Sequence, residues 1–485
     1  MRYKKVLLVN LAYPGYLGNI STPPTGLGSL AQALQEAEID YGFLDLGFWS
    51  YKQEKKRLFS ELKKYSPDLI GISMMTLCYL DHYELLNSIK KEFPGIALLV
   101  GGAHISTFRE EALKECWAID FGVVLEGDKT LVELCQGRAF AEIKGLIYRR
   151  GEEVVYAGDR EFIQDLDSLS WPRYHNFSLK NYSQTMPIVT SRGCPYDCIY
   201  CPVRLAIGRK FRMRSAENVI GEMEYWHKKG YRKFDIWDDN FTLVAPRVYK
   251  ICDIIEKKGW DDIELGVPNG VRADRVNREM LSRMKEVGFT MLSFGVESGS
   301  NKVLQNLRKG ETVEVIEQAI ADACELGYKV FLYFLIGSPG ETWNDFQASL
   351  SLAQRYPVAE ARFYTLIPFP GTELYDWVKE HNYFAVSPNE YLNIVPHFSA
   401  DPCFTTPEMS KEERIKAFNL GWELTSKQRR IYRARRLNHL GLLGKVITRF
   451  TVSDFYHNIF KPSWLRKIFI EPLKNYIFKK KKQNG

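Results

Sequence analysis

The 485-residue sequence lacks the features that mark several common classes of protein. No uninterrupted apolar run approaches the ~18 residues that a membrane-spanning helix requires. The N-terminal residues lead directly into an apolar segment at 6–9 that is too short, and wrongly flanked, for a secretory signal peptide. No G-x-G-x-x-G follows this first predicted strand, so a nicotinamide or flavin site is not supported. We therefore expect neither a membrane span nor a secreted protein.

Cysteine occurs nine times, but only three of these residues lie close together. Cys194, Cys198 and Cys201 form a C-x3-C-x2-C pattern after the apolar run at 187–190, whereas the other six are scattered singly in apolar or helical surroundings. The scatter argues against disulfides, and the lack of a second cysteine pair argues against a zinc site. Neighbouring thiolates can hold three irons of a 4Fe-4S cluster and leave the fourth open to a small molecule. The spacing therefore predicts an oxygen-sensitive iron-sulfur protein of the cytoplasm.

The cysteine pattern, with the aromatic residue Tyr200 before its last cysteine, resembles the signature of radical S-adenosylmethionine (SAM) enzymes. The resemblance implies that the open iron chelates the amino and carboxylate groups of SAM. An electron from the cluster, supplied by a donor such as flavodoxin or ferredoxin, then breaks the S–C5′ bond and yields a 5′-deoxyadenosyl radical. The protein's part is to exclude water from this radical and to aim it at one C–H bond of the substrate.

The segment 1–135 alternates apolar strands with amphipathic helices. Strands are expected at 6–10, 41–45, 69–73, 97–102 and 121–124. Such a pattern predicts an α/β fold with a doubly wound, Rossmann-like parallel sheet, whose ligands bind at the carboxyl ends of the strands. The expected binding residues at these ends are Asn10, Asp45, Ser73, Met75, Thr76, Gly101, Gly102, His104, Glu126 and Gly127.

Residues 1–135 also resemble the cobalamin-binding domain found in front of many radical SAM enzymes. The segments that carry the resemblance include 23–28, 67–73, 100–104 and 126–128. The D-x-H-x-x-G pattern that supplies a histidine to cobalt in other cobalamin proteins is absent, so we expect cobalamin to bind without a histidine on the metal. His104 either contacts the cofactor or caps a helix, since loops after strands serve both purposes.

A second run of strands and helices spans 187–380, after a connector at 136–186. The connector reads as a β-hairpin followed by an extended link, and we assign it no chemistry. Strands of the second run are expected at 187–191, 233–237, 263–267, 291–296, 329–336 and 361–367. Six such units predict a partial (β/α)6 barrel, an incomplete TIM barrel, with its active site at the carboxyl ends of the strands. The cysteine loop follows the first strand.

The chemistry of SAM explains the residue types that follow these strands. We expect SAM to be bound by Tyr200, Asp238, Asn240, Arg272, Glu297, Ser298 and Gly337. Asp238 and Asn240 suit its ammonium, and Arg272 suits its carboxylate. Glu297 or Ser298 suits the ribose hydroxyls, and adenine is expected beside Tyr200 and Gly337. A strand-end acid also commonly caps a helix, which is the alternative for Asp238. We assign no catalytic acid or base.

The region 381–485 is expected to be helical and basic, with a long helix at 408–435. Residues 427–485 hold 16 lysines and arginines against two acids, so the net charge of +7 belongs to this tail. Interleaved aromatic residues fit either peripheral contact with the inner face of an anionic membrane or a helical cap packed on the barrel. Because residues 1–426 are net negative and no RNA-binding module is recognisable, nucleic-acid binding is not expected.

The resemblance implies an enzyme that transfers a methyl group from methylcobalamin to an unactivated carbon of a small molecule. The tail favours a lipid or isoprenoid substrate. One alternative is a radical cyclase, ring-modifying or carbon-coupling enzyme that does not use cobalamin as methyl donor. The alternative from another class is a cobalamin- or cluster-based sensor that turns nothing over.

Overall fold

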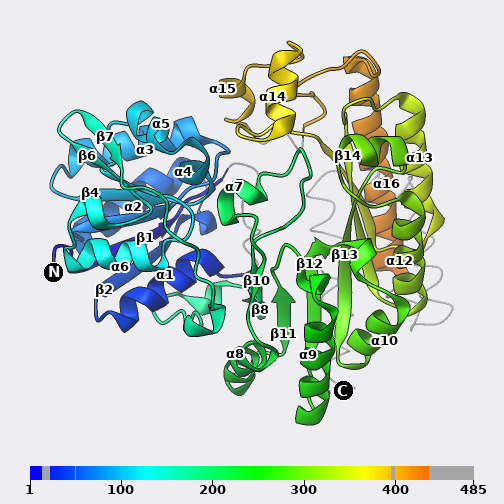
Figure 1. Ribbon diagram of the computed structural model, residues 1–485, viewed down its shortest axis with the longest axis horizontal. Helices are drawn as coiled ribbons and strands as arrows, with labels where there is room; N and C mark the ends of the chain where they lie inside the picture. The colour runs from blue at the N-terminus through cyan, green and yellow to red at the C-terminus, as the bar shows by residue number, and fades with distance from the viewer. Residues whose placement is uncertain (14–21, 50, 395–398, 436–485) are drawn as a thin grey trace, which may run out of the picture.

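The computed structural model describes residues 1–13, 22–49, 51–394 and 399–435. Within them the chain forms two large sheets, the first in its blue and cyan part and the second in its green part (Figure 1). The predicted α/β architecture is confirmed, with an N-terminal parallel sheet, a second parallel sheet and a helical C-terminal part. The basic tail beyond residue 435 lies outside the described residues.

The N-terminal sheet has seven strands in the order β2-β1-β3-β4-β5-β6-β7. Its elements are β1 (Lys5–Asn10), α1 (Thr25–Glu36), β2 (Asp40–Asp45), α2 (Tyr51–Tyr65), β3 (Leu69–Ser73), α3 (Tyr79–Glu92), β4 (Ala97–Gly101), α4 (Ala103–Phe108), α5 (Glu110–Glu115), β5 (Phe121–Val123), α6 (Asp128–Gln136), β6 (Leu146–Arg150) and β7 (Glu153–Tyr156). β1 to β5 are parallel, as predicted from their apolar runs. β6 and β7 pair antiparallel beside β5, so the hairpin expected in the connector extends this sheet instead.

The second sheet contains six parallel strands in the order β15-β14-β13-β12-β11-β8. The elements of this half are β8 (Thr185–Ile188), β9 (Ser191–Arg192), α7 (Val203–Ile207), β10 (Arg212–Met213), α8 (Ala216–Lys228), β11 (Lys233–Ile236), α9 (Ala245–Lys258), β12 (Glu264–Val271), α10 (Arg278–Glu286), β13 (Phe289–Glu297), α11 (Asn301–Asn306), α12 (Val313–Glu325), β14 (Lys329–Ile336), α13 (Trp343–Arg355), β15 (Glu360–Thr365), α14 (Glu373–Glu380), α15 (Pro388–Tyr391) and α16 (Lys411–Arg435). All six predicted strands are present, and they form the partial barrel expected from the sequence.

Local sequence signals fix the ends of the barrel helices. The Ser215 side chain accepts a hydrogen bond from the backbone N–H of Asn218 and so caps α8. Thr342 and Asp345 form a reciprocal capping box at the start of α13. Gly259 ends α9 in the left-handed conformation that glycine adopts readily. These caps hold each helix, and hence each strand-end loop, in a defined place.

The long helix α16 covers the free edge of strand β15. The backbone N–H of Ala361 donates to Gln428 Oε1 at 2.7 Å, and the Gln428 amide donates in turn to the Ala353 carbonyl at 2.7 Å. The Thr425 hydroxyl donates to the Ala361 carbonyl. The predicted helix therefore exists, but it starts at Lys411 instead of 408. The capping pair is Ser410 with Glu413, whose side chains accept hydrogen bonds from each other's backbone N–H groups.

The two sheets share buried hydrophobic clusters. Buried side chains from β1, α1 and α6 belong to the same cluster as those of β8, α8 and the barrel strands. The connector bridges them, since Phe177 stacks on Phe43 with ring centres 3.5 Å apart. No described helix is both long and apolar enough to cross a bilayer.

Candidate functional site

The three cysteines lie on the loop between β9 and α7, and each is a partly exposed free thiol. Gly193 precedes this loop with φ +93°, and a Cβ there would collide with the carbonyl oxygen of Lys210. Across the described residues, no three His, Cys, Asp or Glu side chains are grouped so that they could hold a single metal ion.

Buried cations flank the cysteine loop. Burial raises the pKa of the Cys198 thiol, whereas the charges of Lys309 and Arg272 act in the opposite direction. Lys309 donates a hydrogen bond to Glu297 Oε1 at 3.1 Å, and its Nζ lies 3.4 Å from Glu311 Oε2. Burial alone would lower the pKa of Lys309, but these two carboxylates raise it, so the ammonium stays charged. Nearby positive charge favours the thiolates that bind iron.

Arg272 has spare hydrogen-bonding capacity at this loop. Its Nε donates to Asp274 at 2.9 Å, its Nη1 donates to the Lys309 carbonyl at 2.8 Å, and its guanidinium lies 3.6 Å from the ring centre of Tyr196. The remaining nitrogen, Nη2, is buried and has no hydrogen-bond partner within the described part of the chain. A planar guanidinium with an open donor fits a carboxylate, as predicted for SAM.

Three other predicted residues meet near the cysteines. The side-chain amide of Asn240 donates to Cys194 Sγ at 3.0 Å, and the hydroxyl of Tyr200 donates to Glu297 Oε1 at 2.9 Å. Glu297 has φ +63°, an uncommon conformation for a residue with a side chain. Such positions concentrate at functional sites, where the surrounding structure imposes them.

The polar groups of the remaining predicted SAM residues are already engaged. Asp238 is buried, and its carboxylate accepts hydrogen bonds from the Thr190 backbone at 2.6 Å and the Ser191 hydroxyl at 2.6 Å. These bonds link the end of β11 to the segment that leads from β8 into β9, and the contact of Asp238 with the SAM ammonium stays a prediction. Ser298 accepts a hydrogen bond from the loop that follows it, and Gly337 is bonded to α16 through its carbonyl.

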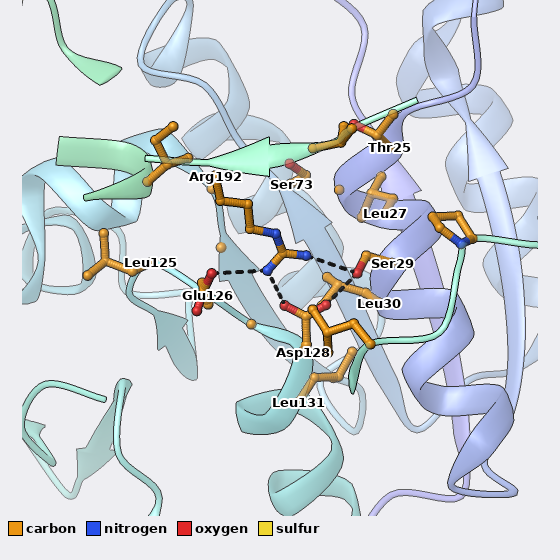
Figure 2. A pocket seen from close by; sticks show the side chains of 18 of the residues that line it. Thr25, Leu27, Ser29, Leu30, Ser73, Leu125, Glu126, Asp128, Leu131 and Arg192 are labelled. Carbon is orange, nitrogen blue, oxygen red and sulfur yellow. Dashed lines mark hydrogen bonds and ion pairs between the residues drawn. The ribbon is translucent and has the colours of Figure 1, made fainter. Parts of the chain in front are cut away.

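A pocket of about 370 Å³ lies between the two sheets. The predicted cobalamin residues among its lining are Ser73, Gly101, Gly102, Glu126 and Gly127. Val189, Trp237 and Asp239 line it from the barrel side, and the connector contributes residues between 166 and 174. The connector therefore forms part of the pocket wall. Figure 2 shows Arg192 reaching to Glu126 and Asp128 in this pocket.

The other predicted cobalamin residues do not line the pocket. His104 lies in α4 with no exposed surface, and its Nε2 is bonded to the Tyr83 hydroxyl at 2.6 Å. Burial lowers the pKa of His104 to about 3, which keeps it neutral. Asn10 donates a hydrogen bond to Asp45 at 2.9 Å, and this pair links the ends of the neighbouring strands β1 and β2. Met75 and Thr76 also lie outside the lining; Met75 is 53% exposed and Thr76 is buried.

Comparison with known proteins agrees with this geometry. Residues 188–353 match the Radical SAM superfamily, and residues 20–135 match the B12 binding domain. An uncharacterized methyltransferase of Pyrococcus horikoshii is 30% identical over 429 residues, which cover 85% of this chain and 91% of that protein. The chain belongs to the B12-binding radical SAM enzymes.

Two further relatives of this radical SAM enzyme have more specific names. Cytidylyl-2-hydroxyethylphosphonate methyltransferase of Streptomyces wedmorensis is 26% identical, covering 77% of this chain and 81% of that protein. The structure of the radical SAM methyltransferase TsrM from Kitasatospora setae, with cobalamin and a [4Fe-4S] cluster bound, has a TM-score of 0.68 at 20% identity. That match covers 87% of this chain and 89% of TsrM, and it shows a shared fold.

Membership of this family confirms the predicted cofactors. The radical SAM domain implies a 4Fe-4S cluster and SAM, and the B12-binding domain implies cobalamin. The residues present fit each of them. The three free thiols and adjacent cations fit the cluster, the open Nη2 of Arg272 fits the SAM carboxylate, and the pocket at the sheet's carboxyl edge fits cobalamin.

The radical SAM enzyme also has site residues that sequence reasoning missed. Lys309 and Glu311 follow α11, where no motif spacing marks them, and only their burial reveals a role. Arg192 lies two residues before Cys194, so its place beside the cysteine pattern was the available signal. Asp239 lines the pocket, and burial raises its pKa to about 6, with the charge of Asp238 adding to the shift.

Proposed function

We propose that this enzyme methylates an unactivated carbon of a small-molecule substrate, using cobalamin as the methyl carrier. The observation that carries the proposal is the shared wall of the pocket. Gly101 and Gly102 line it from the B12-binding sheet, while Val189 and Trp237 line it from the barrel. A methyl group carried there would lie beside the barrel mouth, where the cysteine loop is. The methyltransferase name of the P. horikoshii relative supports the same reaction type.

The chain's own residues bind and orient the reactants. When bound, the cluster and SAM supply a 5′-deoxyadenosyl radical, and cobalamin supplies a methyl group. Cys194, Cys198 and Cys201 hold the cluster, and Asn240 donates a hydrogen bond to the first of these sulfurs. Arg272 anchors the SAM carboxylate through its open donor. Orientation of this kind is what directs a reactive radical to one C–H bond.

Two products test this reaction. Anaerobically reconstituted enzyme with SAM, cobalamin and a reductant should form both 5′-deoxyadenosine and S-adenosylhomocysteine when its substrate is present. Mass spectrometry of metabolites from cells with and without the gene would identify a substrate that gains a methyl group. Deoxyadenosine without S-adenosylhomocysteine would instead favour a cyclase or carbon-coupling reaction.

The substrate we propose is a lipid or polyprenoid-like molecule reached at an anionic membrane surface. The support is the sequence at 436–485, which holds 11 lysines and arginines against two acids, with aromatic residues between them. The S. wedmorensis relative is named for a polar, nucleotide-linked phosphonate, so a soluble substrate is the competing expectation.

Vesicle binding distinguishes a lipid substrate from a soluble one. Truncation after Arg435 leaves α16 intact and should abolish salt-sensitive binding to vesicles that contain anionic lipid. Equal binding by the full-length and truncated proteins, or binding by neither, would refute the lipid proposal.

A further inference from the structure

An ion-pair network around Arg192 lies in the pocket between the two sheets, and Figure 2 shows its contacts with Glu126, Asp128 and Ser29. The Nη1 of Arg192 donates to Glu126 at 3.1 Å and to Asp128 at 3.2 Å, and its Nη2 donates to Ser29 at 3.4 Å. Both acids and Ser29 belong to the B12-binding domain and line the pocket. Arg192 precedes Cys194 by two residues. Arg192 therefore contacts the pocket lining through its side chain and lies two residues from the first cysteine along the backbone.

A second arginine reinforces the same contact. Arg212 lies in β10, directly opposite Arg192 in β9, and its side chain is only 2% exposed. Its Nη1 donates to Glu126 at 2.6 Å and to the Ile163 carbonyl at 2.9 Å. The other oxygen of Glu126 accepts the Ile163 backbone N–H at 2.8 Å. Glu126 is thus held by both strands that close the cysteine loop.

The strand pair leaves the loop little freedom at its base. The backbone N–H of Cys194 donates to the Gly208 carbonyl at 3.2 Å. Gly193 has φ +93°, and a Cβ at this position would strike the backbone of Lys210 on the opposite side. A displacement of β9 or β10 is therefore passed to Cys194, because the backbone there is already in close contact.

We propose that this network couples occupancy of the cobalamin pocket to the position of the cysteine loop, with Arg192 as the positioning residue. The two arginines and the acids Glu126 and Asp128 balance in charge and are largely buried. Separating such pairs leaves uncompensated charge, so the acids and the strand pair move together. A cofactor that contacts Glu126 and Asp128 shifts the cysteine loop, and a cysteine loop that is fixed by its cluster changes the shape of the pocket. The effect of cobalamin on cluster affinity must therefore equal the effect of the cluster on cobalamin affinity.

The test is a double-mutant cycle on the affinity for hydroxocobalamin. Dissociation constants are measured anaerobically for cluster-loaded protein and for the Cys194→Ala/Cys198→Ala/Cys201→Ala variant, each with and without Arg192→Gln. With arginine present, the cluster-loaded protein should bind hydroxocobalamin about fivefold or more tightly than the cluster-free variant. With Arg192→Gln this ratio should fall towards one.

Further variants guard against a general loss of folding. Ser29→Ala removes one arm of the network without leaving a buried charge unpaired, and it should lower the ratio partly. Arg160→Gln is the matched control, because Arg160 pairs with Glu133 on the same domain and outside the pocket lining. It should leave the ratio unchanged. With a chemical reductant in excess, so that the cluster stays reduced and the added cobalamin is in the cob(II) state, the electron paramagnetic resonance spectrum of the cluster should also shift on adding cobalamin, and this shift should be absent in Arg192→Gln.

The proposal rests on cobalamin binding in this pocket, and the outcomes separate the two claims. An enzyme that methylates its substrate but shows the same ratio with and without Arg192→Gln overturns the coupling alone. A ratio of one between the cluster-loaded protein and the cluster-free cysteine variant, both with Arg192 in place, also overturns the coupling alone. A protein that binds no hydroxocobalamin overturns the proposed function together with the coupling.

Discussion

Replacement of Arg272 by glutamine should weaken SAM binding while the cluster stays in place. Nη2 of Arg272 is a buried donor without a partner beside the cysteine loop, and the SAM carboxylate would satisfy it. A hydrogen bond to a charged group contributes about 1.5–3 kcal/mol. At about 1.4 kcal/mol per tenfold change, the dissociation constant for SAM should rise about 10- to 150-fold. Arg272→Lys keeps the charge but loses the planar fork, so its dissociation constant for SAM should lie between those of the unaltered protein and Arg272→Gln.

The assay is anaerobic equilibrium binding of SAM to cluster-loaded protein, with iron content and melting temperature measured on each variant. Arg275→Gln is the control, because Arg275 donates to the hydroxyl of Tyr196 at 2.7 Å and belongs to the same loop as Arg272, but its side chain is 44% exposed. It should change SAM affinity less than twofold. An Arg272→Gln protein with full iron and unchanged SAM affinity would refute the assignment.

Three other predictions concern the cluster, the buried histidine and the barrel edge. Replacing Cys194, Cys198 and Cys201 together by alanine should remove about four irons per chain and the iron-sulfur absorption, which elemental analysis and spectroscopy would show. His104→Phe should leave the spectrum of bound hydroxocobalamin unchanged. Since the folded pKa of His104 is about 3 and its ordinary value is 6.5, the unfolded chain takes up the proton first and stability falls between these pH values; His104→Phe should reduce that fall in acid denaturation curves. Gln428→Ala leaves buried backbone groups unpaired and should destabilise the protein by about 1–3 kcal/mol, seen as a lower melting temperature.

The features that the sequence predicted well are local ones. The six barrel strands are apolar runs whose burial follows from composition, and the cysteine loop is defined by its own spacing. Arg272, Asn240 and Tyr200 were predicted because each follows a strand whose end lies at the barrel mouth. For these residues, position along the chain was enough to fix position in space.

The contacts that could not be predicted depend on partners far along the chain. His104 follows a strand like a ligand-binding residue, but the Tyr83 hydroxyl, 21 residues earlier, is bonded to its Nε2. Asp238 accepts hydrogen bonds from residues 47 and 48 positions before it. The antiparallel pairing of β6 with β5 is likewise not marked in the apolar pattern. The pattern of a single sequence predicts which face of a helix or strand is buried, but it does not predict which distant side chain that face contacts.

The cover that α16 provides for β15 affects how the barrel is made on the ribosome. Ala361 depends on Gln428 and Thr425, which are synthesised later. About 70 residues separate the ends of β15 and α16, and synthesis at ~5–20 residues per second takes about 4–14 s to supply them. During that interval the nascent barrel presents an open strand edge to other chains. The β15 edge of the partial barrel is therefore covered only after α16 has been synthesised.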